Sequence, residues 1–178
     1  VKLSDAPLIV LEGDEYLSSP IDKRPKFHLY KPHIGVISGI AWDHINVFPT
    51  FKNYVNQFRI FKNTVSEQLI YCNEDKELNK LMLEKTKCEI IDYGTPEHKI
   101  INGVTSIDNC DLKIFGRHNL QNLNAAMLVC MQLGINKKSF INDIKNFKGA
   151  ANRLELISNE KDFSIYKDFA HSPSKLKA

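Results

Sequence analysis

Apolar and polar residues alternate with two different periods along the first hundred positions of the chain. The segments 51–65 and 73–85 repeat apolar side chains every three to four residues, which predicts two amphipathic helices, the second capped by Asn73. Short apolar runs separate these helices and predict strands, at residues 8–11, 33–42, 67–72 and 88–94. Strands that alternate with helices in this way indicate an α/β fold with a parallel sheet.

The pattern changes after residue 97. Residues 98–116 alternate between apolar and polar positions, with turn signals at Asn102-Gly103 and Asp108-Asn109, which predicts a small antiparallel ribbon. Two further helices are expected, over 117–134 with Gly134 at its end and over 136–147 with Asn136 as its cap.

A small-residue linker, residues 148–153, comes before a final predicted hairpin. We therefore expect a central α/β domain over residues 1–151 and the beginning of a second domain over 152–178. A unit as short as this second one cannot bury a core of its own. We expect the chain to be a piece of a longer protein.

Composition narrows the class of protein. The chain has 178 residues, 43% of them hydrophobic and 25% charged, as in ordinary globular domains. A net charge of +3, spread along the sequence, gives no reason to expect nucleic-acid binding, and no apolar run approaches the roughly 20 residues of a membrane span. The four cysteines form no CxxC pair, which favours reduced thiols in a cytoplasmic protein over a zinc site.

Acidic side chains gather where the first predicted strand ends, in the sequence "LEGDEY" with Glu12, Asp14 and Glu15. Asp43 and His44 follow the next strand. Ligands of open α/β sheets bind outside the carboxyl ends of the strands, and a hard cation such as Mg²⁺ is held by few protein ligands together with substrate phosphates. The alternative is that these acids only cap the next turn.

Two carboxamides, Asn119 and Asn122, lie three residues apart in the first turn of the predicted helix 117–134, so they face the same way. Each has a donor and an acceptor, as the edge of an adenine base requires. Ordinary helix capping by His118 or Asn119 is the alternative.

Three further residues near the end of the chain could serve a phosphate or sugar. Arg153 lies in the linker, where it could reach a phosphate or form a surface ion pair. Asp168 and His171 precede Pro173 at a predicted strand end, where each could equally be an ordinary turn or loop residue.

Five segments occur in an order that resembles the ATP-dependent Mur ligases of peptidoglycan synthesis: "LEGDEY", "DHINVFPTF", "FGRHNLQNLNAA", "NRLE" and "DFAHSPSK". The resemblance implies the central ATP-binding domain of that family and the first strands of its C-terminal domain. The stretch "EGDEYLSSPIDKRPKFHLYKP" is most similar to the branch that joins a tripeptide to UDP-N-acetylmuramate in cell-wall recycling. A sister branch adds L-alanine instead.

The resemblance also implies an amide-forming reaction with ATP and Mg²⁺ as cofactors, in which an amine attacks an acyl phosphate. It assigns Mg²⁺ binding to Glu12 and His44 and adenine recognition to Asn119 and Asn122. On domain closure it places Arg153 at the terminal phosphate and Asp168 at the ribose, and it makes Arg153 and His171 the catalytic candidates.

The chain departs from the family pattern in one major respect. The glycine-rich phosphate loop G-x-x-x-x-G-K-[ST], which should precede Glu12, does not occur in the sequence. We therefore expect the chain to be inactive alone. A non-catalytic nucleotide-binding module and a folate-type polyglutamate ligase are the alternatives.

Overall fold

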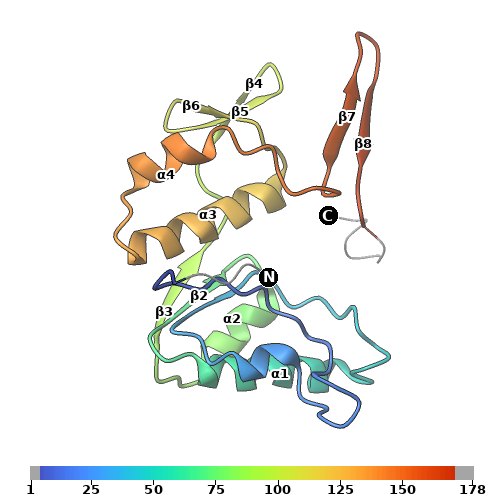
Figure 1. The fold of residues 1–178 in the computed structure, drawn as a ribbon, viewed down its shortest axis with the longest axis vertical. Coiled ribbons are helices and arrows are strands. Elements are labelled where there is room, and N and C mark those ends of the chain that lie inside the picture. Colours follow the sequence, from blue (N-terminus) through green and yellow to red (C-terminus); the bar gives the residue numbers. More distant parts are fainter. Residues whose placement is uncertain (1–4, 171–178) are drawn as a thin grey trace.

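The computed structural model describes residues 5–170. Its first part contains a three-stranded parallel sheet with the strand order β1-β2-β3. The strands β1 (Ile34–Ile37), β2 (Gln68–Cys72) and β3 (Glu89–Tyr93) are joined by α1 (Phe51–Thr64) and α2 (Lys76–Met82) (Figure 1). A short 3₁₀ helix, η1 (Lys26–Leu29), contacts α1. The predicted α/β class and these two helices and three strands are confirmed.

Both faces of the parallel sheet are covered. Leu69 and Ile70, neighbours in β2 whose side chains point to opposite faces, are completely buried. The core around them takes side chains from α1, α2 and the later helix α3 (Arg117–Gln132), among them Tyr54, Phe58, Leu78, Leu81 and Ala125. Burial on both faces explains why β2 has an unbroken apolar run.

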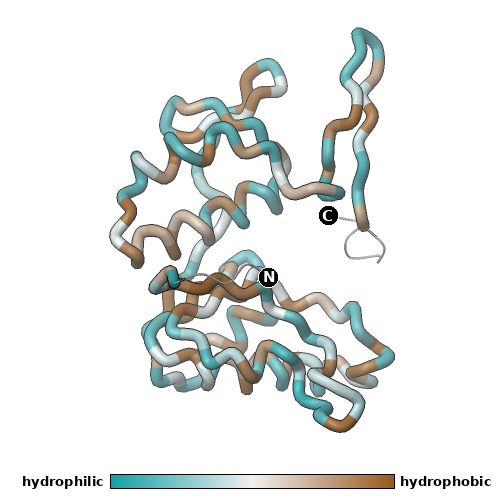
Figure 2. Tube along the Cα trace, viewed as in Figure 1, coloured by the Kyte–Doolittle hydropathy of each residue, from teal (hydrophilic) through white to brown (hydrophobic). Residues whose placement is uncertain are grey.

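The strand predicted at residues 8–11 is not formed. Leu8, Ile9, Val10 and Leu11 are between 52% and 94% exposed and pair with no strand among residues 5–170. They form a run of hydrophobic residues close to the start of the described part of the chain (Figure 2). The prediction was wrong because an apolar run becomes a strand only when a neighbouring backbone completes its hydrogen bonds.

The ribbon after β3 is a three-stranded antiparallel sheet of β4 (Lys99–Ile101), β5 (Val104–Ile107) and β6 (Cys110–Leu112). Its two turns contain Asn102-Gly103, with φ of 50° and 79°, and Asp108-Asn109, with φ of 49° and 62°. Two successive positive φ values define the type I′ turn that matches strand twist, so both turn predictions are confirmed.

Two helices pack beside this ribbon. α3 is followed by Gly134 at φ +86°, and α4 (Lys137–Ile144) is capped by Asn136, whose side chain accepts the backbone N–H of Ser139. One side of α3 joins the core of the parallel sheet. Another side forms a second core with the ribbon and α4, made by Ile107, Leu112, Leu120, Leu123, Met127, Phe140 and Ile141.

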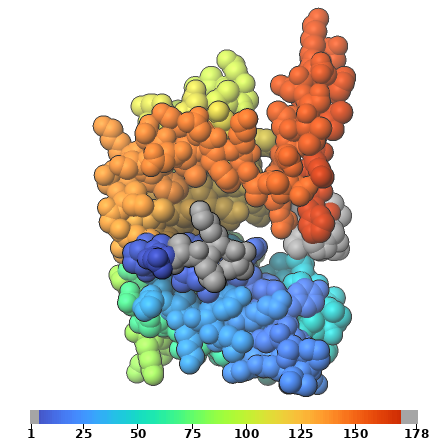
Figure 3. Space-filling model, viewed as in Figure 1, coloured from blue at the N-terminus to red at the C-terminus, as the bar shows by residue number. Residues whose placement is uncertain are grey.

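The last described segment is a hairpin of β7 (Glu155–Asn159) and β8 (Ser164–Lys167). It projects from the rest of the molecule (Figures 1 and 3). A ring contact between Phe115 and Tyr166, with centroids 5.5 Å apart, joins it to the segment before α3. No helix within residues 5–170 is long and apolar enough to cross a membrane.

The start of α2 differs from the prediction in its cap. Asp75, not Asn73, is the N-cap: one carboxylate oxygen accepts the N–H groups of Glu77 and Leu78 at 2.8 and 2.9 Å. Its other oxygen accepts the N–H of Ile40 at 2.8 Å. One side chain therefore fixes both the start of α2 and the loop after β1.

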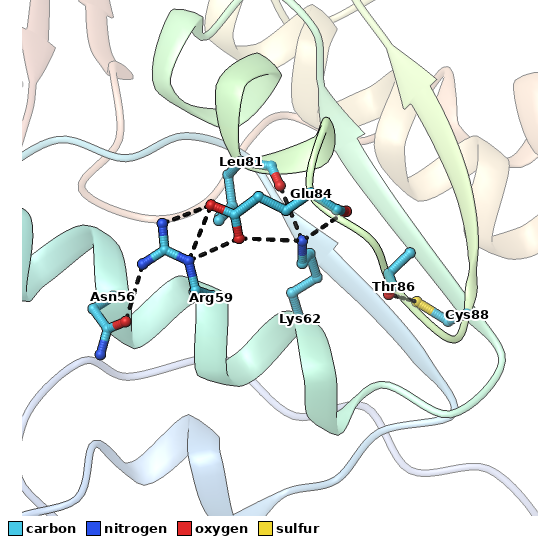
Figure 4. Close-up of polar contacts among 7 residues, drawn as sticks. All are labelled: Asn56, Arg59, Lys62, Leu81, Glu84, Thr86 and Cys88. Carbon is cyan, nitrogen blue, oxygen red and sulfur yellow. Dashed lines mark hydrogen bonds and ion pairs between the residues drawn. The ribbon is translucent and has the colours of Figure 1, made fainter.

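The end of α2 is held by a buried lysine (Figure 4). Lys62 of α1, whose side chain is fully buried, donates to the carbonyl oxygens of Leu81 and Glu84 at 3.0 and 3.1 Å. The Glu84 carboxylate lies 3.8 Å from the ammonium and is itself bound by Arg59. Burial lowers the pKa of Lys62, and the carbonyls and Glu84 replace the water that the ammonium has lost.

We expect Lys62→Met to destabilise the fold by about 1–3 kcal/mol, because the carbonyl oxygens of Leu81 and Glu84 would each lose the hydrogen bond that the buried ammonium donates. Urea unfolding measures the change. Lys80→Met is the matched control, since Lys80 is 70% exposed and pairs only with Glu77. Equal losses of stability in the two variants would contradict this role of Lys62.

Candidate functional site

The three parallel strands end at one edge of the sheet, and each continues into a polar loop. β1 leads to Ser38 and onward to His44, β2 to residues 73–75, and β3 to Gly94 and Thr95. The acidic segment 12–15 lies beside the end of β1, because the two line the same hollow. This carboxyl edge is the part of an α/β sheet where ligands bind.

The hollow has a volume of about 280 Å³. Glu12, Gly13 and Glu15 line it together with Ser38 and Gly39 and with an apolar group made of Phe27, Val36, Ile37, Phe58 and Phe61. It therefore combines carboxylates, backbone polar groups and apolar walls.

The three acids of the segment have different surroundings. Asp14 forms an ion pair with Lys26 at 2.6 Å, and this hydrogen bond lowers the pKa of Asp14. Glu15 accepts the hydroxyl of the buried Tyr54 at 3.3 Å, and burial raises the pKa of that phenol. Glu12 has no hydrogen bond or ion pair within the described part of the chain. Glu12 is thus the carboxylate that remains available to a ligand.

His44 lies with Glu15 and not with Glu12. Its Nε2 is 3.8 Å from a carboxylate oxygen of Glu15, and the ring of Tyr16 contacts the imidazole edge to face at 4.5 Å. Within residues 5–170 no three His, Cys, Asp or Glu side chains form a group that could hold a metal ion. The donors present, a free carboxylate and a nearby imidazole, suit a cation that keeps most of its ligands from water and phosphate.

A second carboxylate, Glu74, lies further along the edge, after the central strand β2. It accepts the backbone N–H of Thr95 after β3 and is bound by the guanidinium of Arg117, whose Nε is 2.9 Å away. The hydrogen bonds from Thr95 and Arg117 lower the pKa of Glu74 to about 2. Since Arg117 is the first residue of α3, this carboxylate joins the helix to the sheet.

Gly94 makes this approach possible. A side-chain Cβ at this position would lie 2.9 Å from the carboxylate of Glu74 and from the carboxamide of Asn73, closer than real Cβ contacts. The carbonyl of Gly94 also accepts a hydrogen bond from Asn124 of α3 at 2.9 Å.

The first two turns of α3 carry the predicted asparagines, Asn119 in the first turn and Asn122 in the second. The N-cap of the helix is Gly116, at φ +85°, without any side-chain cap, so capping by His118 or Asn119 does not occur. Asn119 donates to the carbonyl of Phe115 at 2.8 Å and keeps its amide oxygen available. Asn122 is exposed and has no hydrogen bond within residues 5–170.

The linker and hairpin hold the remaining candidates. Asp168 accepts the N–H of Leu154 at 2.8 Å and that of Ala170 at 2.6 Å, which closes the base of the hairpin. Arg153 is exposed, and its guanidinium has no partner within the described part of the chain. His171 lies outside the described residues. Neither Arg153 nor Asp168 contacts the hollow beside Glu12.

Sequence reasoning missed Glu74 and Arg117. They are 43 residues apart, and nothing in the local pattern of either segment indicates the pair. The one available signal for Glu74 was its place in the acidic sequence "NED", directly after an apolar strand. Those acids were interpreted as the first turn of a helix.

The fold is that of an α/β domain, the class of protein that binds its ligands at the carboxyl edge of the sheet. Residues 5–130 match the Mur ligase middle domain. The chain therefore belongs to the Mur ligase family.

Individual relatives agree with this assignment. The chain is 27% identical over 194 residues to the UDP-N-acetylmuramate–L-alanine ligase of Clostridium tetani, covering 94% of this chain and 41% of that protein. The structure is similar to MurF of Acinetobacter baumannii, with TM-score 0.70 and 18% identity over 85% of this chain and 37% of that one. It also resembles the murein peptide ligase of Psychrobacter arcticus, with a TM-score of 0.65 and 21% identity. This match covers 92% of the present chain and 37% of that protein.

The pKa of Glu74 predicts a pH dependence of stability. The folded value of about 2 lies below the ordinary value of 4.5, so the stabilisation is complete above pH 4.5 and is lost as the pH falls through about 2. We expect the free energy of unfolding to decrease more steeply between pH 4.5 and 2 in the wild type than in Glu74→Gln. Glu97→Gln, at an exposed position whose carboxylate has no hydrogen bond or ion pair among the described residues, is the control. Parallel pH profiles for all three proteins would contradict the assignment.

Proposed function

We propose that the protein to which this chain belongs is an ATP-dependent amide ligase that acts on UDP-N-acetylmuramate. Family membership supports the reaction class. The observation that carries the proposal is Glu12, whose carboxylate borders a hollow at the carboxyl edge of the sheet and has no partner among residues 5–170, while the neighbouring acids Asp14 and Glu15 are paired. The chain spans 41% of the length of a curated relative, so the whole reaction belongs to a longer protein.

In the proposed reaction ATP phosphorylates the lactyl carboxylate of the sugar, and the amine of the acceptor attacks the acyl phosphate and releases phosphate. Glu12 and His44 would hold Mg²⁺, whose charge offsets that of the phosphoryl oxygens during transfer. Glu15 and Tyr16 keep the imidazole of His44 oriented at the edge of the site. Asn119 and Asn122 would bind the adenine base with their carboxamides.

The hairpin would begin a second domain, with the boundary near residue 151. Arg153 and Asp168 lie at its base, so a rotation of that domain would move both together. In this proposal Arg153 reaches the terminal phosphate and Asp168 the ribose when the domains close, and His171 acts beside them.

The acceptor we favour is the tripeptide L-alanyl-γ-D-glutamyl-meso-diaminopimelate, with L-alanine as the alternative. The segment that resembles the tripeptide branch is ordered against the acidic residues: Pro25 pairs with Leu17, Lys26 binds Asp14, and Phe27 is buried in the wall of the hollow. A segment in this position can influence which substrate the neighbouring site accepts.

Replacing Glu12 tests the metal assignment. In the full-length protein with a non-hydrolysable ATP analogue, we expect Glu12→Gln to raise the half-saturating Mg²⁺ concentration on the order of 10–100-fold. Trp42, the only tryptophan, provides the signal, since its indole N–H donates to Phe48 and it lies two residues from His44. Asp14→Asn is the control, because Asp14 is already bound by Lys26. An equal effect in both variants would contradict a specific role of Glu12.

The overall function is tested with the full-length protein, ATP, Mg²⁺ and UDP-N-acetylmuramate. We expect phosphate release with the tripeptide as acceptor and none with L-alanine. Release with L-alanine alone would replace the proposed acceptor by that of the sister branch. Release with neither acceptor, from folded protein, would contradict the ligase and leave a nucleotide-binding module.

A further inference from the structure

The first three residues of α3 have little apolar packing. Arg117 and His118 are exposed and Asn119 is partly exposed, and the first fully buried side chain of the helix is Leu120. Apolar contacts therefore hold the helix from Leu120 onward, while the position of its first residues depends on polar contacts.

Those polar contacts lie on one face of the helix. Arg117, Gln121 and Asn124 follow each other at spacings of four and three residues, which places them in one row. Arg117 binds Glu74, the buried Gln121 lies one turn further, and Asn124 binds the carbonyl of Gly94. The row faces the ends of β2 and β3.

Asn119 and Asn122 lie on a different face. At about 100° per residue, Asn119 is about 160° and Asn122 about 140° from Arg117 around the helix axis. If the contacts of Arg117, Gln121 and Asn124 were lost, the helix could rotate slightly about its axis. Such a rotation would move both carboxamides in the same direction. The contact of Glu74 with Arg117 fixes the first residue of the helix, two residues before Asn119 and five before Asn122.

Glu74 is suited to fix the start of α3 because it is itself held firmly. It accepts the backbone N–H of Thr95, it precedes Asp75, which caps α2, and its side chain is only 25% exposed. Two nitrogens of Arg117, Nε and one terminal amino group, bind the same carboxylate oxygen, Oε2. Charge-assisted bonds from a planar guanidinium fix orientation as well as distance.

We propose that Glu74 and Arg117 form a clamp that positions the N-terminal two turns of α3, so that Asn119 and Asn122 recognise a purine base with an adenine edge. Glu74 is a positioning residue in this scheme and does not touch the nucleotide. The inference rests on the proposed function, because it gives a determinant of nucleotide selectivity to the same site.

The test compares ATP with GTP in the full-length protein, by calorimetric binding and by steady-state ligation. We expect Glu74→Gln to raise the Kd and the KM for ATP roughly tenfold, to reduce the preference for ATP over GTP, and to leave kcat close to wild type. Arg117→Met should have the same effects on Kd, KM and preference. Because the side chain of Arg117 is 64% exposed, we expect this variant to fold, and it provides the test if Glu74→Gln does not fold. Arg117→Lys, which keeps the charge but not the fork, should give an intermediate preference.

Glu84→Gln is the matched control. It removes another carboxylate–arginine pair, with Arg59, that joins α1 to the end of α2. We expect it to lower the melting temperature without changing the preference for ATP. If the wild type prefers ATP over GTP and both Glu74→Gln and Arg117→Met keep that preference unchanged, the clamp is overturned but the proposed function is not. A wild type that binds no nucleotide would overturn the proposed function together with the clamp.

Discussion

Neutralising carboxylates along one edge of a parallel sheet is the constraint on which the rest of this structure depends. Like charges repel, and a carboxylate removed from water without a partner is costly. Four acids at this edge are each paired with a different part of the chain: Asp14 with Lys26, Glu15 with Tyr54, Glu74 with Arg117, and Asp75 with the N–H groups of α2 and Ile40. The acids therefore act as the joints between the sheet and the elements around it.

This arrangement explains why one acid can serve chemistry. Glu12 lies in the same short segment as Asp14 and Glu15 but has no partner among the described residues, and it borders the hollow. A site for a cation and phosphate needs a carboxylate that is not already neutralised. The adenine end of the proposed site is separate from it, since Asn119 and Asn122 belong to α3, which Glu74 attaches to the ends of β2 and β3.

Much of the fold could be predicted from the sequence because its determinants are local. The helix over 51–65 follows from apolar spacing, and the turns at 102–103 and 108–109 follow from residues that tolerate positive φ. The strand at 8–11 failed because strand formation depends on a partner that local pattern does not contain. The predicted cap of α2, Asn73, was wrong because Asn73 and Asp75 are both residue types that cap helices. In the structure only Asp75 accepts two N–H groups of the helix, and it also accepts the N–H of Ile40.

The residues of the candidate site also fall into those that local sequence indicates and those that it does not. Glu12, His44, Asn119 and Asn122 were accessible to sequence reasoning because each belongs to a recognisable segment, and their roles remain proposals. The Glu74–Arg117 pair was not accessible, because it joins two loops through the fold.

The central claim is that the edge is divided between a metal end at Glu12 and His44 and a base end at α3. The most direct measurement is an NMR spectrum of the full-length protein with an ATP analogue and Mn²⁺ in place of Mg²⁺. The account predicts paramagnetic broadening of the backbone amides of Gly13, Glu15 and His44, with those of Asn119 and Asn122 shifted by the nucleotide but still visible. Broadening centred on α3, or on neither end of this edge, would contradict it.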